Sequence, residues 1–99
     1  MEKRIIKFEN ILDETEKILN DLEKVLDRLK ENQKNYNELK QYYGSEEYIK
    51  DVDLDNTTDL YKNIKRGVLS EDAVYNLIGK SYDMYIQMIE VATLLLKQH

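Results

Sequence analysis

The chain has 99 residues and a formal net charge of −5 at pH 7, with 35% charged and 41% apolar residues. It contains no proline, no cysteine and only three glycines, a composition that favours long helices and excludes disulfides and thiol chemistry. The acidic excess lies in residues 44–72, and no cluster of Lys and Arg offers a surface for a phosphate backbone, which argues against direct nucleic-acid binding.

A heptad pattern runs from the N-terminus to Tyr43. One row comprises Phe8, Thr15, Leu22, Leu29, Tyr36 and Tyr43, a second comprises Ile11, Ile18, Val25, Asn32 and Leu39, and Leu12, Leu19 and Leu26 widen the stripe. A 3.5-residue repeat held this long predicts a helix that supercoils around partner helices. Asn32 and Gln33 place polar groups in the seam, typical of a register-setting layer, a kink or a loop. Because the phase resumes at Tyr36, we predict one continuous helix.

The stretch YYGSEEY, residues 42–48, ends this pattern. Gly44 is suited to the left-handed conformation just past a helix end. Ser45 is a predicted N-cap, and Glu46 and Glu47 would lie in the first turn of the next helix, where acids complement the helix dipole. The pattern therefore predicts a stop, a turn and a short helix of roughly residues 46–52.

Residues 51–59, DVDLDNTTD, are predicted to form a loop. Asp51, Asp53 and Asp55 match the first three ligand positions of a calcium-binding loop. Such a loop needs glycine at its sixth position and glutamate at its twelfth, where this chain has Asn56 and Lys62. We interpret the segment as a solvated acidic loop and keep calcium as a weak alternative.

The last helix is expected at about residues 71–98, after a helical turn closed by Gly67. Ser70 is its predicted N-cap, with Glu71 and Asp72 in the first turn. Its polar stripe is narrow and comprises Asn76, Lys80, Asp83, Gln87, Glu90 and Lys97. A helix that is apolar around most of its circumference is buried on several sides. Gly79, inside it, predicts close helix packing or a slight kink.

With YYGS at 42–45 and RGVLSEDAVYNLI at 66–78, the chain resembles a small bacterial family of helical proteins known as a domain of unknown function. YYGS and LSED motifs mark that family, and the likeness covers nearly the whole chain. Tyr48 stands where a tryptophan is expected, so an aromatic is kept. The resemblance implies an all-helical fold and no particular activity.

A weaker likeness is to the helical-hairpin substrates and partners of type VII secretion. Those proteins carry Trp-x-Gly at their turn, where this chain has Tyr42-Tyr43-Gly44. The missing tryptophan and the long acidic middle count against this likeness.

No catalytic set is evident in the sequence. The lone histidine is the last residue, His99, and the serines at 45 and 70 are explained as helix caps. We therefore expect no enzyme, no cofactor and no catalytic residue. The candidate interaction residues lie where YYGSEEY would meet RGVLSED, and comprise Tyr42, Tyr43, Ser45, Tyr48, Arg66, Ser70 and Asp72.

These patterns together predict a single all-α domain spanning residues 1–99: an antiparallel helical bundle with long N-terminal and C-terminal helices and one or two short helices between them. No signal peptide or run of about 18 apolar residues is present, so we expect a cytoplasmic protein without a membrane span. The expected function is protein–protein interaction through helical surfaces, with itself or another helical protein. A small acidic inhibitor or antitoxin, a pocket for a ligand or reaction, and a type VII secretion partner are alternatives.

Overall fold

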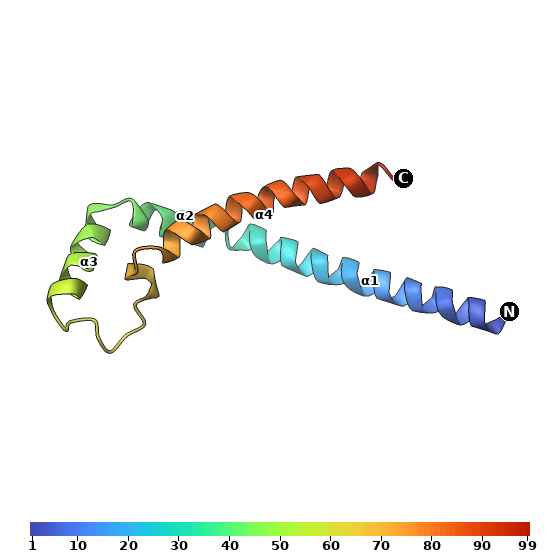
Figure 1. Cartoon of the computed structure of the whole chain (residues 1–99), viewed down its shortest axis with the longest axis horizontal. Helices are drawn as coiled ribbons and strands as arrows, with labels where there is room; N and C mark the ends of the chain where they lie inside the picture. Colours follow the sequence, from blue (N-terminus) through green and yellow to red (C-terminus); the bar gives the residue numbers. More distant parts are fainter. The chain divides into compact units, whose positions relative to one another are not determined.

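The computed structural model describes residues 1–99 and contains four α-helices, one 3₁₀ helix and no strand (Figure 1). The elements are α1 (Glu2–Glu31), α2 (Gln33–Tyr43), α3 (Glu46–Thr57), η1 (Gly67–Leu69) and α4 (Ala73–Leu96). The predicted all-α class, with long helices at both ends, is confirmed. The chain divides into two compact units, Met1–Leu39 and Lys40–His99. The antiparallel packing of the two long helices and the single domain stay predictions.

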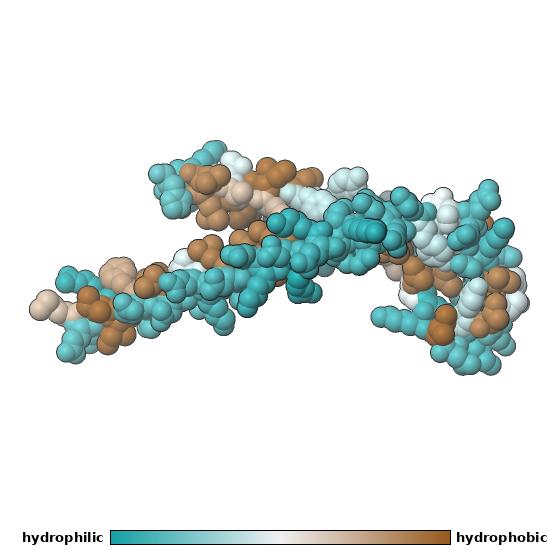
Figure 2. All heavy atoms as spheres, turned by 180° about the vertical axis from the view of Figure 1, so that it is seen from behind, coloured by the Kyte–Doolittle hydropathy of each residue, from teal (hydrophilic) through white to brown (hydrophobic).

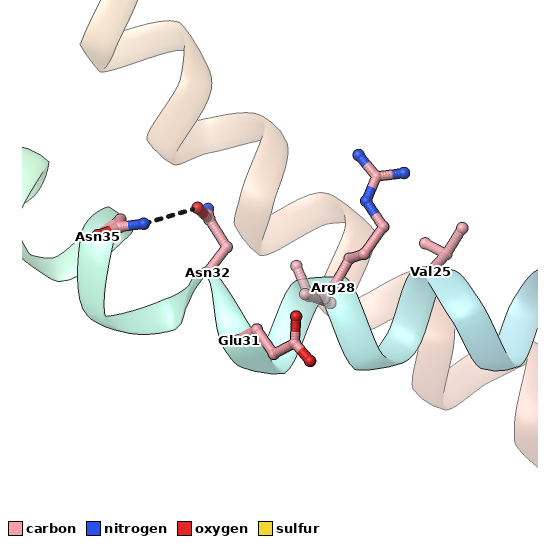
Figure 3. A pocket seen from close by; sticks show the side chains of 6 residues that line it. Val25, Arg28, Glu31, Asn32 and Asn35 are labelled. Atoms are coloured by element: carbon pink, nitrogen blue, oxygen red, sulfur yellow. Dashed lines mark hydrogen bonds between the residues drawn. The ribbon is translucent and has the colours of Figure 1, made fainter.

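The predicted continuity of the first helix is wrong, because α1 and α2 are separated at Asn32. The interruption is slight. Asn32 keeps right-handed helical angles of φ −78° and ψ −8°, its N–H donates to the Arg28 carbonyl at 2.9 Å, and its carbonyl accepts from the Tyr36 N–H at 3.0 Å. Figure 3 shows the Asn35 amide directed at the Asn32 side chain, with a nitrogen–oxygen distance of 3.5 Å. Asn is a weaker helix former than most residues of α1, and the break is limited to this one residue instead of forming a loop.

A shallow hollow lies beside this break, on the first unit. It is lined by Val25, Arg28, Leu29, Glu31, Asn32 and Asn35 (Figure 3). Polar and charged side chains make up most of the lining. Its charged lining is limited to Arg28 and Glu31.

The turn between α2 and α3 follows the sequence prediction in part. Ser45 is the N-cap of α3, and its Oγ accepts a hydrogen bond from the Tyr48 N–H at 3.2 Å. Gly44 is not left-handed, since no glycine in the chain has a positive φ. Its N–H instead donates to the Lys40 carbonyl at 3.2 Å and continues the helical bonding by one residue.

The predicted acidic loop is also wrong, because α3 continues through residues 51–57. The hydroxyls of Thr57 and Thr58 donate to the carbonyls of Asp53 and Leu54, at 2.8 and 2.6 Å. Such bonds to the carbonyl four residues earlier close the helix end. Local propensity for Asp, Asn and Thr favours a loop, whereas in the fold Asp51 and Asp55 are held by Tyr42, Tyr61 and Arg66.

The connection from α3 to α4 consists of turns and η1. Ser70 is not the N-cap of the last helix: it follows η1, and its Oγ donates to the Gly67 carbonyl at 2.8 Å. Helix α4 begins at Ala73, with Asp72 at the N-cap position and no side-chain capping bond. The predicted N-cap at Ser70 is therefore wrong and two residues early, because Ser70 ends η1 before α4 begins.

The core of the second unit is small. Val74, in the first turn of α4, is 3% exposed and is the one buried hydrophobic residue. It lies where η1 packs against α4, and η1 in turn packs against α3. Nothing lies within 4 Å of the position that a Cβ on Gly79 would take, so the predicted close packing at this glycine is absent from the structure.

Candidate functional site

A groove lies on the second unit where the two sequence motifs meet. This α3–η1 groove has a volume of about 900 Å³ and is lined by Tyr43, Tyr48, Ile49, Val52, Asp55, Asn56, Arg66, Leu69, Ser70 and Glu71. The apolar lining comes from α3 and η1, and charged groups stand among it. The structure thus brings four of the seven candidate interaction residues to one surface: Tyr43, Tyr48, Arg66 and Ser70.

An aromatic cluster forms one wall of the groove. The Tyr48 ring meets the Tyr43 ring with centroids 5.1 Å apart and the Tyr42 ring with centroids 5.5 Å apart, both edge to face. Edge-to-face pairs of this kind contribute about 0.5–1.5 kcal/mol beyond the area they bury. Tyr48 therefore joins the first turn of α3 to the end of α2.

Tyr42 does not line the groove, and a carboxylate accepts a hydrogen bond from its hydroxyl. Its hydroxyl donates to Asp51 Oδ2 at 2.5 Å, and the Tyr61 hydroxyl donates to Asp51 Oδ1 at 3.1 Å. The hydrogen bond to Asp51, together with burial and the carboxylate charge, raises the pKa of Tyr42 to about 12. The same carboxylate raises the pKa of Tyr61, chiefly through its hydrogen bond. Asp51, on α3, is therefore hydrogen-bonded both to the end of α2 and to the segment that precedes η1.

An ion pair lies among the residues that line the groove. Arg66 Nη1 lies 2.8 Å from Asp55 Oδ1, and the Asp55 side chain is 17% exposed. The bond joins α3 to the residue just before η1. Because Asp55 and Asp51 are four residues apart on one helix, a single face of α3 supplies both carboxylates.

The two remaining candidate residues serve local structure. The Ser45 hydroxyl donates to the Tyr42 carbonyl at 2.6 Å while it caps α3. The Asp72 carbonyl accepts from the Asn76 N–H at 2.8 Å in the first turn of α4. Neither side chain lines the groove.

The acidic residues of α3 do not form a calcium loop. In a helix, Asp53 points away from the face that carries Asp51 and Asp55, so the three carboxylates diverge. Asp51 is engaged by two tyrosines and Asp55 by Arg66. No group of three or more His, Asp or Glu side chains is arranged to hold a metal ion.

Two exposed apolar stripes are the other candidate surface. The α1 stripe consists of Phe8, Ile11, Leu12, Ile18, Leu19, Leu22, Val25 and Leu29, which are between 36% and 57% exposed. The α4 stripe consists of Tyr75, Tyr82, Ile86, Ile89 and Leu96, which are between 54% and 73% exposed. Hydrophobic residues, brown in Figure 2, are visible at the surface of both long helices.

Sequence reasoning missed the partners that organise the groove. The sequence predicts a loop for Asp51 and Asp55 and a helical turn for Tyr61, and the pairings of the two carboxylates join residues nine to eleven positions apart. The i,i+4 spacing of Asp51 and Asp55 was the available signal for a shared helix face. Nothing in the sequence indicated which tyrosine or arginine each would bind.

No helix is both long and apolar enough to cross a membrane.

No match to the chain was found among curated proteins or among solved structures. A family model, described as domain of unknown function DUF4298, matches residues 5–91. That range includes both motifs, the α3–η1 groove and most of the two long helices. The chain therefore belongs to the DUF4298 family.

Proposed function

We propose that this protein is a non-enzymatic interaction module that associates with itself through its long helices. The observation that carries the proposal is the α1 stripe, whose eight apolar side chains are all at least 36% exposed. No other element of the first unit packs along α1. An exposed apolar stripe of this length is typical of a protein–protein interaction surface.

The energetics favour association of such stripes. Completing the burial of a half-exposed Leu, Ile, Val or Phe contributes roughly 1 kcal/mol, about half the value for full burial. Two copies together bring sixteen such side chains from their α1 stripes. That contribution is comparable to, or larger than, the roughly 4–15 kcal/mol that association costs in lost translational and rotational freedom.

Light scattering coupled to size exclusion, over a wide concentration range, tests the proposal. We expect a molar mass that is a multiple of 11.9 kDa. Replacing Leu22 and Leu29 by Asp should reduce it to the monomer value, because each substitution places a carboxylate in the stripe. The matched control replaces Asn10 and Asn20, which lie outside the stripe, by Asp. A wild-type monomer at all concentrations would overturn the proposal, and an oligomer that survives Leu22→Asp with Leu29→Asp would exclude this stripe as the interface.

The non-enzymatic part of the proposal is supported by how the polar side chains are used. The hydroxyls of Ser45 and Ser70 each donate to a backbone carbonyl three residues earlier. The lone histidine is the last residue. Hydroxyls held in this way are turn and cap groups rather than nucleophiles.

The alternatives have less support. Two of the aspartates that would present charge to a basic partner are engaged within the chain, Asp51 by tyrosines and Asp55 by Arg66. The Tyr42-Tyr43-Gly44 segment joins α2 to the twelve-residue α3 rather than to a long helix, unlike the turn of a helical hairpin. Binding of a basic partner that depends on Asp53 would revive the acidic-inhibitor function.

A further inference from the structure

Helix α4 has more apolar circumference than one neighbouring helix can cover. At about 100° per residue, its polar residues Asn76, Lys80, Asp83, Gln87 and Glu90 fall within roughly a quarter of the circumference. A second sector contains Val74, which is buried, and Ile78, Ser81 and Tyr85, which are half-buried. The α4 stripe lies in the next sector, with Tyr75, Ile89 and Leu96 each 69% exposed or more.

One chain supplies too few long helices to cover α4. The chain has one other long helix, α1, and it carries a single apolar stripe. A helix that is apolar over most of its girth needs neighbours on at least two sides. Even if α1 packs along one apolar sector of α4, another sector is left without a helix from the same chain.

We infer that the α4 stripe of one copy packs against the α4 stripe of a second copy, in a two-fold symmetric pair. The inference rests on the proposed self-association and names a surface for it. An isologous interface needs one self-complementary patch, and this stripe contains no charged residue that would oppose its own copy. The charged residues of α4 belong to the polar sector.

The area is sufficient for a specific pair. With about 150–250 Å² for a fully accessible aromatic side chain and somewhat less for Ile and Leu, the exposures of the five stripe residues leave roughly 500 Å² of surface per copy. Two copies facing one another would bury roughly 1,000 Å², the lower limit for a specific interface, before any flanking residue is counted. The two tyrosines suit such a position, because their rings bury area while their hydroxyls reach water.

The absence of cysteine allows a direct test by disulfide cross-linking. Tyr82→Cys, Ile86→Cys and Ile89→Cys each place a single thiol in the stripe, and Gln87→Cys places one in the polar sector as the control. On mild oxidation of dilute full-length protein, we expect a covalent dimer from at least one stripe variant and none from the control. No dimer from any of the three, or a dimer formed equally well by Gln87→Cys, would overturn the inference.

A charge substitution separates this inference from the proposed function. Ile86→Asp should weaken association at least tenfold, measured by light scattering on dilution, whereas Gln87→Asp should leave it unchanged, with circular dichroism checking that both remain helical. An oligomer that Leu22→Asp with Leu29→Asp dissociates but that Ile86→Asp leaves intact would refute pairing through α4 while the proposed function stands. A wild-type monomer would refute both.

Discussion

The Tyr42 hydroxyl donates a hydrogen bond to the Asp51 carboxylate at 2.5 Å, and Tyr61 donates to the other oxygen of the same carboxylate at 3.1 Å. One side chain of α3 therefore holds the end of α2 and the segment that precedes η1. Because Val74 is the one buried hydrophobic residue, hydrogen bonds that join separate segments should contribute a large share of the stability of the second unit.

Tyr42→Phe should destabilise the second unit by about 1.5–3 kcal/mol, the range for a hydrogen bond to a charged group. The ring and its contact with Tyr48 are kept, so the loss reports the hydroxyl alone. Urea unfolding followed by circular dichroism measures the change. Tyr75→Phe, at a 69% exposed position, is the control and should change the free energy of unfolding by less than about 0.5 kcal/mol. Equal effects of the two substitutions would contradict a specific role for the Tyr42 hydroxyl.

Stability should fall at alkaline pH because of the same contact. The pKa of Tyr42 is about 12 in the folded chain, above the ordinary value of 10.0, since its protonated hydroxyl donates to Asp51. A raised folded-state pKa means that the unfolded chain loses its proton first as pH rises. The contribution is fully present below pH 10 and is lost between about pH 10 and 12.

Spectrophotometric titration of tyrosine ionisation checks this. Both Tyr42 and Tyr61 should ionise late in the wild-type chain, and Tyr42→Phe should remove the later of these ionisations, near pH 12, while Tyr61 remains. The free energy of unfolding of that variant should also depend less on pH above 10. A titration that is uniform across the tyrosines and unaffected by the substitution would be incompatible with the contact.

Arg66→Ala should loosen the segment between α3 and α4. It removes the bond to Asp55 at 2.8 Å and leaves a carboxylate that is 17% exposed without its partner. The Arg66 side chain is itself 43% exposed, so solvent screening limits the cost to about 1 kcal/mol. We expect faster amide hydrogen exchange in residues 58–72 with α1 unchanged. Lys65→Ala, next in sequence and exposed, is the control; exchange that rises equally in both variants would remove the role assigned to the ion pair.

Two serines that look equivalent in the sequence should respond differently. Ser45→Ala removes the N-cap of α3 and should cost about 1 kcal/mol. Ser70→Ala removes one exposed bond to the Gly67 carbonyl and caps no α-helix, so we expect less than about 0.5 kcal/mol. Thermal unfolding of the two variants compares them directly. A larger loss for Ser70→Ala would show that α4 is capped by Ser70 in solution.

Gly79→Ala should stabilise α4. The added methyl group meets nothing within 4 Å, and alanine in a helix interior is favoured over glycine by about 1 kcal/mol. The midpoint of thermal unfolding should therefore rise by a few degrees, on the order of 4–8 °C per kcal/mol for a domain of this size. A lower midpoint together with a weaker oligomer would mean that another helix approaches Gly79 in the assembly.

The sequence by itself determined the helical class, the long helices at both ends, the turn at residues 44–45 and the cap at Ser45. These features depend on apolar periodicity and on hydrogen bonds between residues within four positions of one another, so the local pattern contains the information. The residues at which these helices begin and end follow less directly from the local pattern. Asn32, a weak helix former, interrupts the first helix, and Ser70 ends η1 before α4 begins.

The tertiary structure alone decided how the two motifs are joined. Local propensity predicts a loop at Asp51 and Asp55, because Asp, Asn and Thr disfavour helix interiors. Within the fold Asp51 accepts hydrogen bonds from Tyr42 and Tyr61, and Asp55 pairs with Arg66. These contacts support the helical form of α3 and position the residues of the groove. Which of eight tyrosines meets which carboxylate depends on the path of the chain through two turns. That path depends on the packing of η1 against α3 and against α4, and no spacing in the sequence encodes it.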